Sequence, residues 1–348
     1  MKAMTWTMAL LLAGCGDKDT DSGDDTGAEA AALPDYSASG AHTPVTFSDS
    51  LTGSSGVTLA VTAWYPSDEP GDGQPVAYLG LFEGGAYEGL SAACDSPRPV
   101  LVFSHGYGGI GVQSTFFMEH LASHGYVVAA PDHTFNTFLD NDDSKLPEVI
   151  VRRPVDIQDT FDWLVAQSAD ASSPLAGCVD EAGGYAVSGH SFGGYTAYAT
   201  AGATVNLPTG GTGDLSDDRV WAALPMAPWD AGGTLTDGTA DIAVPVMTLS
   251  GTLDTTTDWP MVSGLHGALT VSPRYLGEFP EAGHYSFAPV ACLLTPTDNG
   301  CGDGYTDLDV LTELVNTAGL AFLESSRGVG GAIDQLPPDS ADLTIAVE

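Results

Sequence analysis

Residues 183–197 read GGYAVSGHSFGGYTA, and this stretch decides how the chain around it is interpreted. An apolar run leads into GHSFG at 189–193, and small and aromatic residues follow at helical spacing. A Gly-x-Ser-x-Gly between a buried strand and a helix is typical of a nucleophile elbow, whose serine takes strained backbone angles. Gly189 and Gly193 are small because the turn is too tight for side chains there. We therefore expect Ser191 to stand free at the first turn of a helix, where the helix dipole favours negative charge.

Strands and helices alternate on both sides of this elbow. Apolar runs predict buried strands at 98–106, 126–132, 184–188 and 244–254, and further strands at 219–229 and within 273–284. Helices are predicted at 114–125, 151–169, from about 191, and at 308–325, and edge strands at 43–50 and 57–66. Alternation from about residue 98 onward indicates an α/β fold with a mostly parallel central sheet, flanked by helices and preceded by N-terminal edge strands.

A serine hydroxyl is a weak nucleophile, so it needs a base that is oriented by a carboxylate. After a nucleophile elbow the chain order is serine, then acid, then histidine. His284 follows a strand in FPEAGHYSF and is the predicted base, whereas His266 falls on a helix or its cap. Asp254 directly follows the apolar strand VPVMTLSG and is the predicted acid. The alternatives for the acid are Asp230 and Asp258.

Acyl transfer also requires donors for the oxyanion that develops on the substrate carbonyl. The backbone N–H of Phe192, directly after the serine, is the first expected donor. The glycine-rich loop FSHGYGG at 103–109 follows an earlier strand, and the N–H of Tyr107 is the second expected donor.

Several stretches resemble the α/β-hydrolase esterases of the platelet-activating-factor acetylhydrolase and dienelactone-hydrolase-like group: PVLVFSHGYGG, LASHGYVVAAPDH, GHSFGG and AGHYSF. LASHGYVV, the Gly106-Tyr107 pair and PMAPWD also look like bacterial cutinase-type polyester hydrolases, including those that cut poly(ethylene terephthalate). The resemblance covers roughly residues 40–325 and implies the α/β-hydrolase fold.

The resemblance also implies roles, residue by residue. Ser191 matches the nucleophile, Asp254 the acid and His284 the base. Tyr107 and Phe192 match the oxyanion pair.

Two further positions bear on the substrate. The resemblance places Tyr107 against the substrate, and Trp229 in APWD matches an aromatic residue that lines the cleft of the polyester hydrolases. A tryptophan in the core at a strand end is the alternative for Trp229. The elbow contains His190 and Phe192, which makes it more similar to that of the acetylhydrolases than to that of the polyester hydrolases. The resemblance therefore does not determine which ester is the substrate.

The first residues predict export. Residues 1–14 have one lysine and a short apolar stretch, and they end in LAG before Cys15. This pattern looks like a bacterial lipobox, which implies cleavage before Cys15, its acylation and a lipid anchor in the cell envelope. An ordinary secretion signal is the alternative. Residues 15–35 are predicted to be a disordered acidic tether, 36–328 the catalytic domain and 329–348 a peripheral tail.

Four further cysteines allow three disulfide connectivities. Cys292 and Cys301 bracket a turn-rich loop, and Cys94 and Cys178 each precede a strong strand. We therefore predict the disulfides Cys94–Cys178 and Cys292–Cys301. Zinc ligation is disfavoured because the chain has no CxxC pair.

Charge and spacing restrict the partners. The chain has 9 basic and 46 acidic residues, a net charge of −37, so it is predicted to bind no nucleic acid and to disfavour acidic substrates. We expect no metal or cofactor. His120 and His124 lack a third ligand and are predicted to be surface or capping residues, and the Asp-rich segments 139–143 and 297–307 do not fit EF-hand spacing.

Together these patterns predict an exported serine esterase, monomeric by default, that touches the membrane only through its anchor. Its substrates would be esters of short acyl groups on lipids, or polyester-like chains. A non-catalytic surface-binding lipoprotein and a serine peptidase with the same triad are the alternatives.

Overall fold

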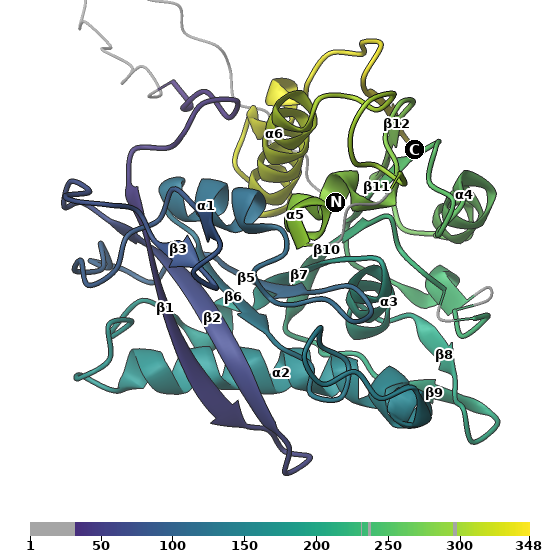
Figure 1. Cartoon of the computed structure of the whole chain (residues 1–348), viewed down its shortest axis with the longest axis horizontal. Helices are drawn as coiled ribbons and strands as arrows, with labels where there is room; N and C mark the ends of the chain where they lie inside the picture. The colour runs from purple at the N-terminus through teal and green to yellow at the C-terminus, as the bar shows by residue number, and fades with distance from the viewer. Residues whose placement is uncertain (1–31, 231, 236–237, 295–297) are drawn as a thin grey trace, which may run out of the picture. The chain divides into compact units, whose positions relative to one another are not determined.

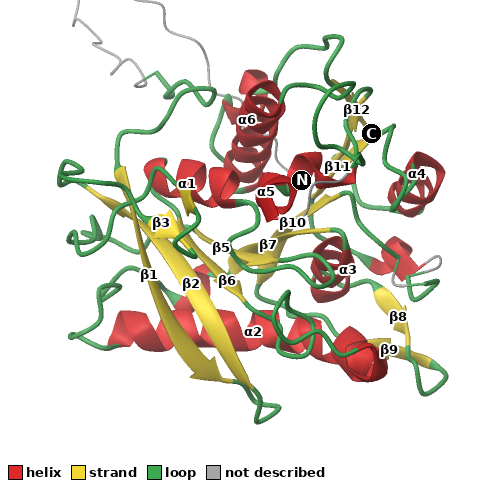
Figure 2. Cartoon of the chain, viewed as in Figure 1, coloured by secondary structure: helices red, strands yellow, loops and turns green. Residues whose placement is uncertain are grey.

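A nine-stranded sheet forms the centre of the structure, in the order β1-β2-β6-β5-β7-β10-β11-β12-β13 (Figures 1 and 2). This computed structural model describes residues 32–230, 232–235, 238–294 and 298–348. The strands of the sheet are β1 (Thr43–Thr52), β2 (Thr58–Ser67), β5 (Val100–Ser104), β6 (Val127–Pro131), β7 (Tyr185–His190), β10 (Val220–Met226), β11 (Val246–Gly251), β12 (Arg274–Phe279) and β13 (Thr344–Val347).

The six strands from β6 to β12 in the sheet order are parallel to one another. The strands β1, β2 and β13 are added antiparallel at the two sides of this parallel core. Every residue of β5, β6, β7 and β11 is buried, because helices cover both faces of the sheet. The α/β-hydrolase fold predicted from the sequence is confirmed.

Helices cover both faces of the sheet (Figure 1). Helices α1 (Thr115–Ser123) and α6 (Leu308–Ser326) contact each other on one face. Helices α2 (Leu146–Ala169) and α3 (Phe192–Thr200) contact each other on the other face. The remaining elements are α4 (Trp259–Gly267), α5 (Pro289–Leu294), the two short hairpins β3 (Ala77–Tyr78) with β4 (Phe82–Glu83) and β8 (Thr204–Asn206) with β9 (Thr212–Asp214), and the 3-10 helices η1 (Asp143–Lys145), η2 (Glu181–Gly183), η3 (Gly238–Asp241), η4 (His284–Phe287) and η5 (Ala332–Gln335).

Three elements differ from their sequence-based predictions. β2 is an interior strand rather than an edge strand, because it pairs with both β1 and β6. α2 begins at Leu146, before the predicted start at residue 151, and continues through Pro154. The tail 329–348 ends in β13, which pairs antiparallel with β12 and so adds the last strand of the sheet.

The predicted signal peptide, Cys15 and nearly all of the predicted tether lie in residues 1–31, outside the described residues. Within the residues that the structure describes, no helix has the length and apolar character needed to cross a membrane.

Both predicted disulfides are present. Cys94–Cys178 joins the segment before β5 to the segment before β7, across 84 residues of sequence. Cys292–Cys301 joins α5 to a loop nine residues further along the chain. The described residues contain no group of three or more His, Cys, Asp or Glu placed to hold a metal ion.

His120 is buried in α1, so the prediction of a surface position was wrong for this residue, whereas His124 does form the C-cap of the helix. The rings of the two histidines lie 4.7 Å apart between their centroids. Burial, and to a lesser degree the neighbouring His124, lowers the pKa of His120 from 6.5 to about 3. The folded chain therefore keeps this ring neutral at pH values where the unfolded chain would protonate it.

Replacing His120 by Phe is expected to flatten the loss of stability in acid. A histidine whose pKa falls on folding contributes stability above its unfolded pKa, and that stability is lost as the pH falls below about 6.5. Removing it should reduce the slope of unfolding free energy against pH by up to about 1.4 kcal/mol per pH unit between about pH 6 and pH 4. Urea unfolding at a series of pH values measures this slope. An unchanged slope in His120→Phe would show that the ring titrates normally in the folded chain.

Candidate active site

The candidate site begins at the turn between β7 and α3. Ser191 has φ 59° and ψ −116°, a left-handed backbone conformation that costs on the order of 1–3 kcal/mol outside glycine. Surrounding hydrogen bonds hold this geometry: the N–H of Ser191 donates to the carbonyl of Met226 at 3.0 Å, and the N–H of Trp229 donates to the carbonyl of Ser191 at 2.9 Å. The strain predicted for a nucleophile elbow is therefore present.

The flanking glycines make room for this turn. A Cβ on Gly189 would stand 2.4 Å from the carbonyl oxygen of Gly193, and a Cβ on Gly193 would stand 1.8 Å from the carbonyl oxygen of Ser104. Gly194 is equally constrained, since its Cβ would stand 2.6 Å from the Cα of Pro228. The first helical turn thus packs directly on the backbone of β5.

The predicted base and acid lie beside the serine. His284 is the first residue of η4, shortly after β12, and its Nε2 lies 2.9 Å from Ser191 Oγ. Asp254 follows β11, and its Oδ2 lies 2.7 Å from His284 Nδ1. All three side chains are buried, with Ser191 exposing 7% of its surface. The serine hydroxyl can donate to Nε2 while the carboxylate accepts from Nδ1–H, as general-base catalysis at a serine requires.

The carboxylate of Asp254 is oriented by the segment that follows it. Its Oδ1 accepts from the N–H groups of Thr256 at 2.7 Å and Thr257 at 2.8 Å, and its Oδ2 accepts from the hydroxyl of Thr257 at 2.6 Å. Burial alone would raise the pKa of Asp254, but the hydrogen bonds from His284 and Thr257 hold it below its ordinary value. The carboxylate is therefore charged at neutral pH.

The alternative residues are engaged elsewhere. Asp230 accepts from the N–H of Gly232 in its own loop, and Asp258 caps α4 by accepting from the N–H of Met261. His266 lies on α4, where its Nδ1 is 2.9 Å from Thr248 Oγ1.

A second buried histidine supports His284 from behind. The Nε2 of His190 lies 2.9 Å from the carbonyl oxygen of His284, and its Nδ1 lies 3.0 Å from Gln113 Nε2. Burial, together with the neighbouring His284, lowers the pKa of His190 to about 3, so its ring is neutral, with one donor and one acceptor nitrogen. Gln113 also accepts from the N–H of Gly106 at 3.0 Å. Gln113 thus connects the glycine-rich loop 103–109, hereafter the oxyanion loop, to the elbow. The contact between Gln113 and His190 spans 77 residues of sequence, and no local pattern signalled it.

Asn299 anchors the backbone of the histidine. Its Oδ1 accepts from the N–H of His284 at 3.1 Å and from the N–H of Thr255 at 3.3 Å. Its Nδ2 donates to the hydroxyl of Thr256 at 2.9 Å. Asn299 lies in the loop that the Cys292–Cys301 disulfide closes. The sequence analysis did not single it out.

The glycine-rich loop after β5 lies against the elbow. A Cβ on Gly106 would stand 3.4 Å from the Cβ of Ser191, so the loop backbone comes close to the serine side chain. Tyr107 follows, and its hydroxyl donates to Asp143 and accepts from Asn141 Nδ2 at 3.1 Å. Phe192 is the first residue of α3, where a helix leaves backbone N–H groups without intrahelical partners. The two residues expected to supply the oxyanion donors therefore lie close to the serine, Phe192 next to it in the chain and Tyr107 in the same pocket lining.

A pocket of about 300 Å³ opens at this point. Its lining includes Tyr107, Phe138, Ser191, His284, Tyr285 and Leu294. No lysine, arginine, aspartate or glutamate is among the lining residues that the structure describes, so the pocket suits an uncharged group. A wider groove of about 610 Å³, beside α2, includes none of the candidate site residues.

Trp229 lies directly beside the elbow, and its role in lining the cleft of the site stays a prediction. Its ring meets Phe192 edge-on, with centroids 5.1 Å apart, and it packs partly buried against the hydrophobic core. The described lining of the pocket does not include it.

Comparisons with known proteins agree with this geometry. Residues 91–286, more than half of the chain, match the family described as PETase, PET hydrolase-like. Cutinase est1 of Thermobifida alba is 32% identical over 157 residues, which cover 44% of this chain and 42% of that protein. Cutinase cut1 of Thermobifida fusca is 30% identical over 157 residues, 44% of this chain and 39% of that protein. The chain thus spans about two fifths of the length of these curated relatives.

Proposed function

This chain belongs to the PET hydrolase-like family, and from that premise we propose that it is a serine esterase that hydrolyses carboxylic esters. The observation that supports this most directly is the continuous hydrogen-bonded series from Ser191 Oγ through His284 to Asp254, with distances of 2.9 and 2.7 Å. This series opens onto a pocket whose described lining residues include no lysine, arginine, aspartate or glutamate.

In the proposed reaction, His284 Nε2 takes the proton from Ser191 as the hydroxyl oxygen attacks the ester carbonyl. The N–H groups of Tyr107 and Phe192 hold the oxyanion of the tetrahedral intermediate. His284 then gives its proton to the leaving alcohol, which leaves an acyl group on Ser191. Water attacks this acyl-enzyme with His284 again as base, and the acid is released. Asp254 keeps the imidazole in the required tautomer and stabilises its charged form throughout.

The substrate we propose is a neutral ester, either a polyester-like chain or a lipid carrying a short acyl group. The relatives are named cutinases, and the apolar walls of the pocket, such as Phe138 and Leu294, match an uncharged acyl chain. The net charge of −37 opposes the binding of acidic substrates.

We further propose that the protein acts outside the cytoplasm, attached to the cell envelope through acylated Cys15 and otherwise monomeric. Two disulfides support an oxidising compartment, and the LAGC pattern at residues 12–15 supports the anchor.

Covalent labelling tests the proposed nucleophile. A fluorophosphonate probe should transfer its phosphonyl group to Ser191 with loss of fluoride, which adds the mass of that group to the Ser191 peptide. p-Nitrophenyl butyrate should slow the labelling by competing for the site. Heat-denatured protein, which has the same serines without the site, is the control. The same preparation should release acid from an aliphatic polyester film and leave a peptide p-nitroanilide intact. Absence of labelling together with absence of ester hydrolysis would refute the proposal, and cleavage of the anilide alone would indicate a peptidase.

A further inference from the structure

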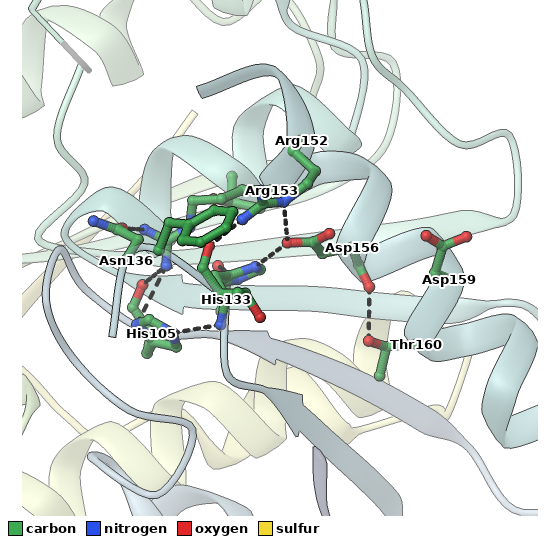
Figure 3. A network of polar contacts seen from close by, with 12 residues as sticks. His105, His133, Asn136, Arg152, Arg153, Asp156, Asp159 and Thr160 are labelled. Carbon is green, nitrogen blue, oxygen red and sulfur yellow. Dashed lines mark hydrogen bonds and ion pairs between the residues drawn. The ribbon is translucent and has the colours of Figure 1, made fainter. Parts of the chain in front are cut away.

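A fully buried polar cluster lies beneath the oxyanion loop, built by residues after β5, after β6 and within α2 (Figure 3). Its central members are His105, His133, Arg153 and Asp156, each with 0% of its surface exposed. None of the four is among the residues that line the active-site pocket. Burying a guanidinium costs several kcal/mol unless its surroundings compensate it, so its contacts indicate what holds it there.

One part of the cluster is a second Ser-His-Asp hydrogen-bonded series, which substrate cannot reach. His133 Nε2 lies 2.9 Å from Ser104 Oγ, and His133 Nδ1 lies 2.8 Å from Asp156 Oδ2. Ser104 is completely buried within β5, so no ester can reach it. The N–H of His133 also donates to His105 Nε2 at 3.0 Å. This series therefore fixes the backbone after β6 to the start of the oxyanion loop.

Arg153 contacts both segments that supply the expected oxyanion donors. Its Nη2 donates to the carbonyl of His105, which belongs to the peptide joining His105 to Gly106, directly before Tyr107. Its guanidinium carbon lies 4.4 Å from the centre of the Phe192 ring. Its Nη1 donates to Asn136 Oδ1 at 3.0 Å, which holds the guanidinium in place from a third side.

Within the part of the chain that the structure describes, Arg153 makes no hydrogen bond to a carboxylate, and Asp156 acts on it only through space. Among the described residues, its hydrogen-bond partners are a carbonyl, an amide and a histidine, whereas the carboxylates of Glu148 and Asp156 pair with Arg152 at 3.1 and 3.5 Å. Burial lowers the pKa of His105 and of His133 well below the ordinary value, so both rings are neutral. The Arg153 guanidinium is therefore shielded from water and is held mainly by neutral hydrogen-bond partners.

We propose that Arg153 is a positioning residue for the oxyanion hole: it holds the His105–Gly106 peptide and the Phe192 ring at a fixed separation. The inference rests on the proposed esterase function. Donors stabilise an oxyanion only when they are already in place, because reorganisation during the reaction would cancel the gain. Arg153 lies behind the site and does not touch substrate. It therefore affects the stability of the transition state more than the affinity for substrate.

The test compares Arg153→Met, which keeps the length but removes the charge, with Arg153→Lys, which keeps the charge and a donor. Arg219→Met is the matched control, since Arg219 also lies over a phenylalanine ring, Phe161, at 4.9 Å and belongs to no part of the site. The measurements are kcat and KM on p-nitrophenyl butyrate, and the affinity for an alkyl trifluoromethyl ketone, which forms a tetrahedral oxyanion on the serine. Each value is normalised to active sites titrated with a fluorophosphonate.

We expect Arg153→Met to lower kcat by roughly 10- to 100-fold with KM within about threefold, and to weaken ketone binding by the same factor as kcat. Arg153→Lys should recover part of both losses, and Arg219→Met should leave both unchanged per active site. If Arg153→Met does not fold, Asn136→Ala, which frees Nη1, should shift kcat and ketone affinity together by a smaller factor.

Unchanged kcat and ketone affinity per active site in Arg153→Met, or in Asn136→Ala where the first variant does not fold, would overturn the positioning role while leaving the esterase proposal intact. A rise in KM with unchanged kcat would overturn it as well. Wild-type protein that neither hydrolyses esters nor binds the ketone would instead refute the proposed function itself.

Discussion

Ser191→Ala is expected to lower kcat/KM for p-nitrophenyl butyrate by at least about 10⁴-fold, because it removes the atom that forms the acyl-enzyme. The proton acceptor at 2.9 Å, His284 Nε2, remains but has no hydroxyl to activate. The oxyanion donors and substrate binding can still assist the slow direct attack of water on the bound ester. Circular dichroism and thermal unfolding should match the wild type, since alanine is smaller than serine and introduces no clash at the strained turn.

Ser188→Ala is the matched control, because Ser188 lies on β7, the strand that leads into the Ser191 turn, and is also buried. Its hydroxyl donates to the carbonyl of Leu224 at 2.6 Å, so its loss should cost about 1 kcal/mol of stability and leave the activity per folded molecule unchanged. If Ser191→Ala kept the wild-type rate, or if Ser188→Ala lost activity to the same extent, the assignment of the nucleophile would be wrong.

Gly193→Ala is expected to give the largest loss of stability of any single methyl group added in this site. The new Cβ would stand 1.8 Å from the carbonyl oxygen of Ser104 and 3.0 Å from that of His105, so backbone rather than a flexible side chain must move. Shifting α3 away from β5 would open the buried interface between them. We expect the free energy of unfolding to fall by more than about 4 kcal/mol, measured by urea denaturation of the isolated variant.

Gly264→Ala separates this effect from the general effect of adding a methyl group to a glycine. Gly264 lies in α4, and a Cβ added there would meet nothing within 4 Å, so alanine should raise stability by up to about 1 kcal/mol through helix propensity. If the free energy of unfolding of Gly193→Ala lay within about 1 kcal/mol of the wild-type value, the elbow would tolerate a wider turn than its geometry implies.

The features of the molecule that could be predicted are those that depend on residues close together in the sequence. The elbow requires small residues at fixed offsets from Ser191, and the buried strands require continuous apolar runs. Both features can therefore be recognised from a short stretch of sequence. The candidate partners could be selected because they follow strand ends in the right chain order. The structure brings Asp254 and His284 to the serine, as that order predicted.

The supporting residues could not be predicted, for a physical reason. Arg153 lies in a helix whose sequence, VRRPVDIQD, reads as amphipathic, and nothing nearby signals that one of two adjacent arginines is completely buried. Its partner His105 is 48 residues away in sequence. β13 was likewise missed, because an edge strand needs only one pairing partner and the tail around it is rich in turn-forming residues.

The loop closed by Cys292–Cys301 gives the candidate site a dependence on its chemical surroundings. This loop contains Asn299, which accepts from the N–H of His284, so the bond between two cysteines restrains the backbone of the proposed base. Where thiols are kept reduced, that tether would be open and the histidine would lose part of its support. Protein made in a reducing cytosol would then contain every proposed catalytic residue and still work below its capacity until an oxidant closed the bond.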